Sequence, residues 1–175
     1  MNDRITGFVL KQSDYREADV IVTVLTKEYG KLSFVAQGVR KMTSKNAGSI
    51  MPYIKTEILF DYNETKTIFR LKNARCKDYY RSMHEDITAS SAAAVAAELI
   101  DVLTLQASSD MTNSDEYAFL DTVFSKLDQG YDPTLVLSLL FVDMLDLAGL
   151  LPDVDACVTC GNTHVVTVSP KDGGF

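Results

Sequence analysis

Short apolar stretches separated by turn residues fill the first 72 residues of the chain. They are rich in Val, Ile, Thr and Phe, which is typical of β-strands. Tyr29-Gly30 joins the second stretch to the third, and Tyr62-Asn63-Glu64 joins the last two. Five antiparallel strands in about 70 residues predict a small closed or partly open barrel of the OB type, and an SH3-like barrel would show the same pattern. The predicted strands are residues 5–10, 20–26, 32–36, 54–60 and 67–71.

After Tyr80 the spacing of apolar residues changes to that of α-helices. Residues 91–105 form the first predicted helix, and its small alanines permit close packing against a neighbouring element. Its expected apolar stripe consists of Val95, Leu99, Val102 and Leu103.

Two further helices are marked by residues at their ends. Asn113 is the expected N-cap of the second, with Glu116 three residues on, and Gly130 ends it. Asp132-Pro133 begins the third helix, which ends before Gly149. Because the third helix is apolar on nearly all sides, we expect it at the centre of a helical bundle. The stripe of the second helix is Tyr117, Leu120, Phe124 and Leu127.

The composition is that of a globular protein. The 175 residues are 46% hydrophobic and 23% charged, which excludes a disordered tail and a collagen-like fibre. The longest apolar stretch, residues 135–148, is shorter than the ~20 residues of a membrane span and carries Asp143 and Asp146. The N-terminus, Met1-Asn2-Asp3-Arg4, lacks the pattern of a signal peptide, so we expect a cytoplasmic protein in a reducing compartment.

Charge is distributed very unevenly along the chain. The net charge of -7 averages a basic first part and an acidic second part. Residues 1–80 contain 14 basic and 9 acidic residues, whereas residues 81–175 contain 3 and 15. This asymmetry predicts a basic binding module joined to an acidic partner domain.

Two basic runs without any acid, residues 29–56 and 66–77, lie in the first part. The long glycine-flanked connection 38–50 carries three of these cations and is the expected functional loop. Lysine and arginine can neutralise phosphates there, because no acid competes. Tyr15 and Phe34 are candidates for stacking on bases, although a barrel of this size also needs core aromatics, which favours the core for Phe34. The predicted DNA-contacting residues are Lys31, Arg40, Lys41, Lys45, Arg70, Lys72 and Arg75.

Cys157-Val-Thr-Cys160-Gly161 has the spacing of a zinc knuckle, in which two thiolates bind one Zn²⁺. Tetrahedral zinc needs two further ligands, and the chain offers His164 nearby and only distant alternatives. A redox CxxC would stand at a strand-to-helix junction, whereas this one follows a helix in a loop. We therefore expect half of a structural zinc site, with the remaining ligands in a second cysteine pair beyond Phe175.

The sequence contains no GxGxxG, GxxxxGK[ST], HExxH or GxSxG motif, which argues against an enzyme. The leading hypothesis is a non-enzymatic DNA-binding protein. One alternative is a protein-interaction adaptor whose basic barrel face binds an acidic protein. Another is a small metal-dependent nuclease built on Asp143 in the acidic part.

Several motifs in a fixed order carry a resemblance to a known family. They are Gly7-Phe-Val-Leu, Asp14-Tyr-Arg-Glu-Ala-Asp19, Thr26-Lys-Glu-Tyr-Gly-Lys31, Ala36-Gln-Gly-Val-Arg-Lys41, Ser44, Ala148-Gly149, Pro152-Asp-Val-Asp-Ala-Cys-Val-Thr-Cys-Gly161 and Gly173-Gly174-Phe175. In these the chain resembles the bacterial RecO family over nearly its whole length.

The resemblance implies a recombination mediator of the RecF pathway without catalytic activity. Such proteins bind single- and double-stranded DNA, anneal complementary strands, engage RecR and the tail of single-stranded-DNA-binding protein, and help load RecA. The resemblance implies a nucleoid-associated, cytoplasmic protein with no membrane partner and no small-molecule substrate. The expected fold is α+β, with an OB-fold domain at 1–80, a helical domain at 81–152 and an incomplete zinc-finger segment at 153–175.

Overall fold

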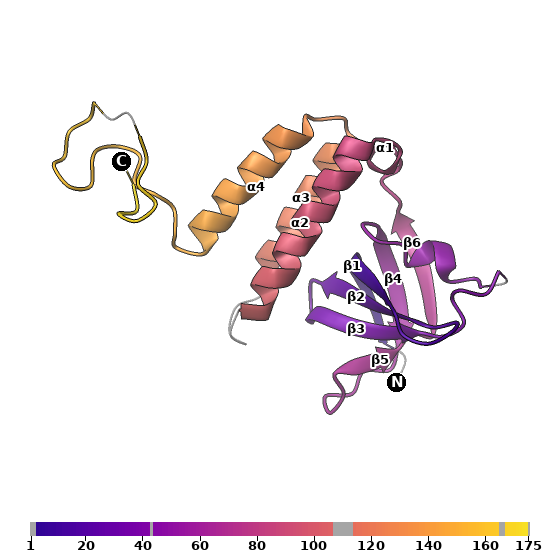
Figure 1. Ribbon diagram of the computed structural model, residues 1–175. Coiled ribbons are helices and arrows are strands. Elements are labelled where there is room, and N and C mark those ends of the chain that lie inside the picture. Colours follow the sequence, from indigo (N-terminus) through magenta and orange to yellow (C-terminus); the bar gives the residue numbers. More distant parts are fainter. Residues whose placement is uncertain (1–2, 43, 107–113, 165–166, 175) are drawn as a thin grey trace. The chain divides into compact units, whose positions relative to one another are not determined.

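The computed structural model describes residues 3–42, 44–106, 114–164 and 167–174 (Figure 1). The chain divides into two compact units, residues 1–136 and 137–175. The first unit contains a curved β-sheet and helices α1 to α3, and the second contains most of helix α4 and an irregular C-terminal segment.

Six strands form one sheet in the order β5-β3-β2-β1-β4-β6. The β3–β5 pair is parallel and the other four pairs are antiparallel. The five predicted strands are present, but the prediction that all are antiparallel is wrong, because the last of them pairs parallel to the third. The described sheet is not closed into a barrel, so the OB-like fold is partly open. The strands are β1 (Asp3–Asp14), β2 (Val20–Thr26), β3 (Gly30–Ala36), β4 (Lys55–Phe60), β5 (Ile68–Arg70) and β6 (Asn73–Asp78).

The sixth strand, β6, was not predicted from the sequence. Its residues, Asn-Ala-Arg-Cys-Lys-Asp, alternate only two small apolar side chains with polar ones, and of these Ala74 is buried and Cys76 partly buried. Backbone pairing with β4 forms this strand, with Arg75 opposite Glu57. A strand held mainly by its backbone at the edge of a sheet leaves little trace in a hydrophobic pattern.

The inner face of the sheet contains the core of the barrel. Phe34 packs edge-on against Phe60, with ring centroids 5.2 Å apart, and both side chains are fully buried. Gly7 permits the close approach of β1 to β2, since a Cβ at this position would lie 2.5 Å from the Leu25 carbonyl oxygen. The pairing of these two strands shifts between Val9 and Lys11, so that one extra residue bulges out of β1.

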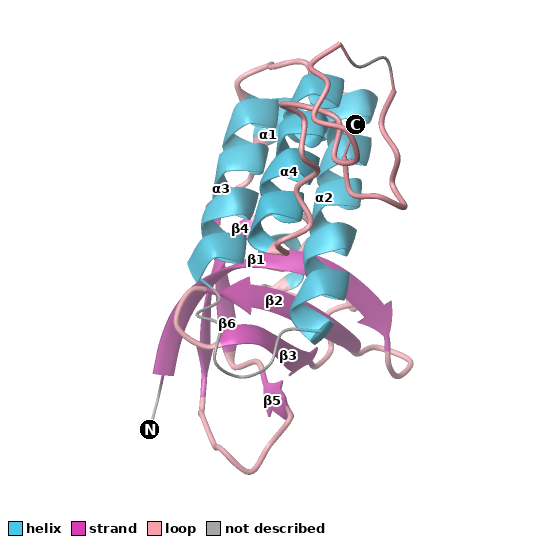
Figure 2. Ribbon diagram, turned by 90° about the vertical axis from the view of Figure 1, so that its left-hand side faces the viewer, coloured by secondary structure: helices cyan, strands magenta, loops and turns pink. Residues whose placement is uncertain are grey.

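The opposite face of β1 packs against helices. Figure 2 shows α2 (Ile87–Gln106) and α3 (Ser114–Asp128) against one side of the sheet. The Phe8 ring, fully buried, contacts Phe124 at 5.5 Å and Tyr117 at 4.8 Å between centroids. The predicted stripe of α3 is thus confirmed. Its expected N-cap, Asn113, lies outside the described residues.

The predicted stripe of α2 is wrong. Val95 and Val102 are 43% and 45% exposed, and the side chain of Leu103 lies outside the described residues. The buried face of α2 consists mainly of alanines, which carry no long side chain and therefore let the helix approach its neighbours closely. The buried residues are Ala89, Ala92, Ala93, Ala96, Ala97 and Ile100. A short helix that was not predicted, α1 (Arg81–Glu85), precedes α2.

Helix α4 (Pro133–Leu147) begins and ends where the sequence predicts. The Asp132 carboxylate accepts a hydrogen bond from the backbone N–H of Leu135 at 2.9 Å, and Gly149 ends the helix with a φ of 66°. The expectation that α4 lies at the centre of a helical bundle stays a prediction, because most of this helix belongs to the second unit. Within the described part of the chain, no helix is long and apolar enough to cross a membrane.

Candidate nucleic-acid interface

The connection from residue 37 to residue 54 is held in place by hydrogen bonds to the barrel. The Asp19 carboxylate accepts a hydrogen bond from the Gly38 N–H at 2.8 Å, and the Arg40 N–H donates to the Ala18 carbonyl at 3.2 Å. Farther along, the Asn46 side-chain oxygen accepts the Ala74 N–H of β6 at 3.1 Å. The side chain of Ile50 is fully buried. The described parts of the loop, on either side of residue 43, therefore present their side chains from an anchored backbone.

Three predicted cations stand on this loop. Lys41 and Lys45 are exposed, and within the described part of the chain neither forms an ion pair. The Arg40 guanidinium lies 3.2 Å from the Asp14 carboxylate, with both side chains about half exposed or more. Exposed pairs of this kind contribute only about 0–1 kcal/mol, so a phosphate can replace Asp14 as the partner of Arg40.

A second group of cations lies on the β4–β6 pair. Glu57 is in contact with Lys77 at 2.9 Å and with Arg4 at 3.8 Å, and it lies opposite Arg75 in the sheet register. The hydrogen bond from Lys77, together with the nearby positive charges, lowers the pKa of the Glu57 carboxyl. Three cations surround one carboxylate, so this surface is net positive. The hydrogen bond between Asn46 and Ala74 links it to the loop.

A third group of cations surrounds β5. A cavity of about 470 Å³ is lined by Lys66, Arg70, Lys72 and Asp61, together with Phe69 and Leu71. The Lys72 ammonium lies 2.6 Å from the Asp61 carboxylate, which lowers the pKa of that carboxyl. Lys66 was not among the predicted contact residues. Its position beside Arg70 and Lys72 in this cavity is a property of the folded chain.

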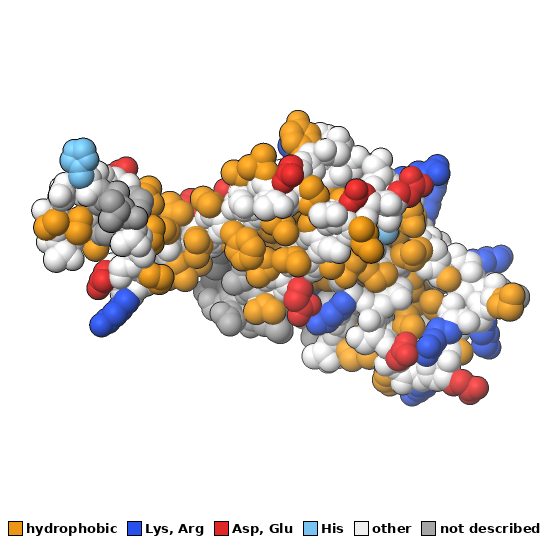
Figure 3. Space-filling view, turned by 45° about the horizontal axis from the view of Figure 1, so that its top comes forward, with side chains coloured by type: hydrophobic (Ala, Val, Ile, Leu, Met, Phe, Trp, Pro, Cys, Tyr) orange, Lys and Arg blue, Asp and Glu red, His pale blue; other side chains and the backbone are white. Residues whose placement is uncertain are grey.

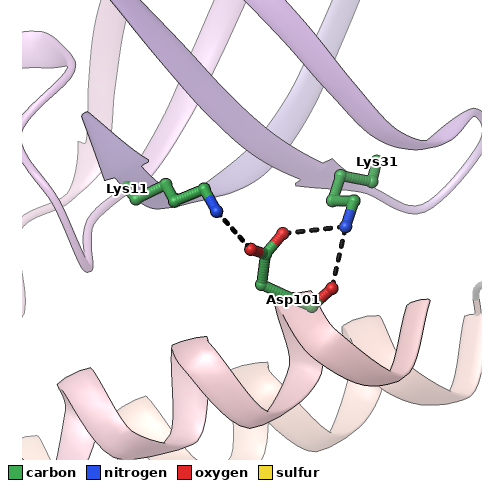
Figure 4. Close-up of polar contacts among 3 residues, drawn as sticks. All are labelled: Lys11, Lys31 and Asp101. Carbon is green, nitrogen blue, oxygen red and sulfur yellow. Dashed lines mark hydrogen bonds and ion pairs between the residues drawn. The ribbon is translucent and has the colours of Figure 1, made fainter. Parts of the chain in front are cut away.

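Lys31 has a different environment from the other predicted cations. Its ammonium donates to the Asp101 carboxylate and to the Asp101 backbone carbonyl of α2, each at 2.8 Å (Figure 4). Lys11 binds the same carboxylate, and the bulge in β1 places it opposite Thr23. Burial alone would raise the pKa of Asp101, but the two lysines outweigh it and hold the pKa below its usual value of 3.8. Lys31 therefore fastens α2 to the barrel.

The two candidates for base stacking separate in the structure. Phe34 is completely buried among Phe60 and Phe69, so its role as a stacking residue is contradicted. Tyr15 is 47% exposed and carries the Arg16 guanidinium 5.0 Å above its ring. Base stacking by Tyr15 stays a prediction.

Two exposed tyrosines that the sequence did not single out meet beside the β5 group. Tyr29 and Tyr62 are 41% and 39% exposed, and their ring centroids lie 4.9 Å apart. They come from different turns, between β2 and β3 and between β4 and β5. The sequence identified both segments as turns from their composition, but it did not indicate that the two tyrosine side chains are in contact.

The positive groups gather on the sheet. In Figure 3 most of the blue atoms lie over the strands and their connecting loops. The pattern agrees with the charge difference between residues 1–80 and the remainder of the chain. A surface of this kind attracts polyanions through interactions that salt screens.

The cysteine motif forms a compact turn. Cys157 accepts the Gly161 N–H at its carbonyl and donates its own N–H to the Asn162 carbonyl, both at 2.8 Å. Backbone N–H groups of Thr159 and Cys160 point to the Cys157 sulfur and lower the pKa of this thiol. This arrangement fits two thiolate ligands of zinc. Among the described residues no group of three or more His, Cys, Asp or Glu side chains could hold a metal ion.

Comparison with known proteins agrees with this geometry. Residues 1–80 match the family model "Recombination protein O N terminal" and residues 84–175 match "Recombination protein O C terminal". The chain is 30% identical to the DNA repair protein RecO of Bacillus subtilis over its full length, covering 67% of that protein. It is 29% identical to RecO of Listeria welshimeri over 92% of this chain, and the matched part spans 61% of the Listeria protein. Two domain models in the right order thus account for nearly every residue, and the chain belongs to the RecO family of DNA repair proteins.

Proposed function

We propose that this protein is a non-enzymatic recombination mediator that binds DNA through the basic surface of its barrel. The observation that carries the proposal is the loop of residues 37–54, which presents Arg40, Lys41 and Lys45 from a backbone fixed by hydrogen bonds. Rigid presentation lowers the entropy that these side chains lose on binding. Arg70, Lys72 and Arg75 extend the surface over β5 and β6.

The partners follow from the family. Binding of both single and double strands, annealing, and loading of RecA together with RecR and single-stranded-DNA-binding protein are part of the proposal. Contacts to phosphates carry no sequence information, so we expect little sequence preference. The net negative charge of residues 81–175 opposes DNA contact, and we assign protein partners to that part.

The test is fluorescence anisotropy of a labelled single strand titrated at several salt concentrations. If about five phosphates are neutralised, log affinity falls with log salt at a slope of roughly -3.5, using ~0.7 per phosphate. The variant Arg40→Ala/Lys41→Ala/Lys45→Ala should bind more weakly, with a slope of roughly -1.4. As a matched control, Lys126→Ala removes one cation from α3 and should leave the slope unchanged.

Competition separates this function from the adaptor hypothesis. An unlabelled oligo(dT) should displace the labelled strand from a DNA-binding protein, whereas a complex with an acidic protein partner should survive it. A slope near zero for the wild type would rule out the electrostatic mechanism.

We also propose that Cys157 and Cys160 supply two of the four ligands of a structural zinc ion. Bound there, the metal would hold the C-terminal segment in one conformation by joining its two cysteines to ligands elsewhere. The lowered pKa of Cys157 favours the thiolate that zinc requires.

A further inference from the structure

A series of aromatic rings leads from the barrel core to the surface beside β5. Phe69 is 3% exposed and stacks on Tyr62, with centroids 5.7 Å apart and an interplanar angle of 20°. Tyr62 in turn contacts Tyr29 at 4.9 Å with an angle of 35°. Tyr62 is thus the shared ring, and the series ends at the surface in Tyr29, which is 41% exposed.

The inner members of this series are fixed. Phe69 also packs edge-on against Phe60 at 5.2 Å, and the Tyr62 N–H donates to the Asp3 carboxylate at 3.0 Å. The Tyr29 N–H donates to the Thr26 hydroxyl at 3.1 Å, which holds its turn. Because core rings and backbone hydrogen bonds hold the tyrosines, the two tilted rings form a preorganised aromatic surface.

Cations lie near the inner end of this series of rings. Phe69, the inner ring of the series, lines the same cavity of about 470 Å³ as Lys66, Arg70 and Lys72. Lys72 is paired with Asp61. Lys66 and Arg70 are exposed, and neither forms an ion pair within the part of the chain that the structure describes. The cavity therefore combines the ring of Phe69 with two cations that form no ion pair among the described residues, beside the pair of Lys72 and Asp61.

We propose that Tyr29 and Tyr62 form a stacking platform for an unpaired nucleobase, whose phosphates lie against Lys66 and Arg70. This inference rests on the proposed function and names the part of the barrel that distinguishes a single strand from a duplex. A nucleotide combines a flat π-face with an adjacent negative charge, which is the combination that the platform and its cations complement. The bases of a duplex are already stacked on one another, so a duplex can use the cations but not the rings.

The experiment compares three DNA probes of equal length by fluorescence anisotropy: oligo(dT), the same backbone with abasic sites, and a duplex. We expect Tyr29→Ala to weaken oligo(dT) binding by between about fivefold and about 150-fold, the effect of losing one stacked base. Binding of the abasic strand and of the duplex should change less than about twofold. Tyr29→Phe keeps the ring and should bind oligo(dT) like the wild type.

Two controls identify the cause. Tyr131→Ala removes a somewhat more exposed ring, 49% against 41% for Tyr29, from the turn after α3 and should leave all three affinities unchanged. Thermal unfolding verifies that Tyr29→Ala is folded. If the base stacks on Tyr29, the losses caused by Tyr29→Ala and by removal of the bases do not add, because both delete the same contact.

The experiment distinguishes a failure of the stacking platform from a failure of the proposed DNA binding. If the wild type binds oligo(dT) with strong salt dependence but Tyr29→Ala binds it equally well, the platform is refuted and the electrostatic function stands. An equal loss for oligo(dT), the abasic strand and the duplex would also refute it, since that result reports a disturbed cation surface. If the wild type binds none of the probes, the proposed function fails and the platform fails with it.

Discussion

The carboxylate of Asp101 holds α2 to the barrel, and removal of its charge should loosen this joint. Its side chain is 5% exposed and receives hydrogen bonds from Lys31, which is 17% exposed, and from Lys11, which is 48% exposed. Hydrogen bonds to charged groups contribute about 1.5–3 kcal/mol when sheltered, and an exposed ion pair about 0–1 kcal/mol. Asn can still accept one hydrogen bond. We therefore expect Asp101→Asn to lower the free energy of unfolding by about 2 kcal/mol.

Urea unfolding at neutral pH measures this loss, and thermal unfolding should show a decrease in Tm of about 4–8 °C. Glu85→Gln is the matched control, because it breaks the exposed pair with Arg81, whose side chains are 82% and 63% exposed. It should cost less than about 0.5 kcal/mol.

The pH dependence has a defined sign. Since the two lysines hold the pKa of Asp101 below 3.8, its stabilising effect is fully present above that value. It is lost as the pH falls through the lower pKa of the folded state. The difference between the wild type and Asp101→Asn should thus be constant near neutral pH and shrink only in strong acid.

A double-mutant cycle can refute the reasoning. Lys31→Met keeps the apolar stem and removes the ammonium that Asp101 binds. If the pair is coupled, the double variant loses at least about 1 kcal/mol less than the sum of the two single losses. Additive losses would mean that Asp101 and Lys31 do not stabilise the joint through their contact.

Three further predictions concern packing and the cysteines. Ala96→Leu should destabilise the protein by about 1–3 kcal/mol in urea unfolding, because Ala96 is fully buried on the close-packed face of α2; Ala94→Leu on the same helix is less buried and should cost less. Phe124→Ala should cost about 3–5 kcal/mol, measured in the same way, since its ring contacts Phe8 and Tyr80. Cys157→Ser should lower the zinc content measured by atomic emission, and an unchanged content would contradict the proposed ligand.

Sequence patterns were informative where local preference and burial agree. The strand at Val20–Thr26 has the predicted ends, and the stripe of α3 faces the core because its large apolar residues recur at helical spacing. On α2 the predicted stripe was wrong, because it was drawn through large apolar residues, whereas the packed face consists mainly of alanines. The hydrophobic pattern does not distinguish a helix that packs through large side chains from one whose small side chains let its backbone approach its neighbours.

In the candidate site, too, some residues could be predicted from the sequence and others could not. The loop cations Arg40, Lys41 and Lys45 could be identified from the sequence, because a basic loop between glycines is a local property. The pairing of Lys31 with Asp101 joins residues 70 positions apart, and no local signal encodes it. The contact of Tyr29 with Tyr62 likewise depends on how two turns of the barrel come together.

The extra residue in β1 affects how a sequence alignment of this strand should be interpreted. With regular pairing, Leu10 would stand opposite Thr23, and Lys11 opposite Val22, whose side chain is in the barrel core. The bulge takes up one position, so Lys11 instead faces α2. A relative that lacks residue 10 would keep both faces of the strand in order, whereas one that retains it in regular pairing would direct a lysine inward. A single gap at this position is therefore expected to keep Lys11 directed at α2, and its structural cost is the loss of the Leu10 side chain, which is 3% exposed.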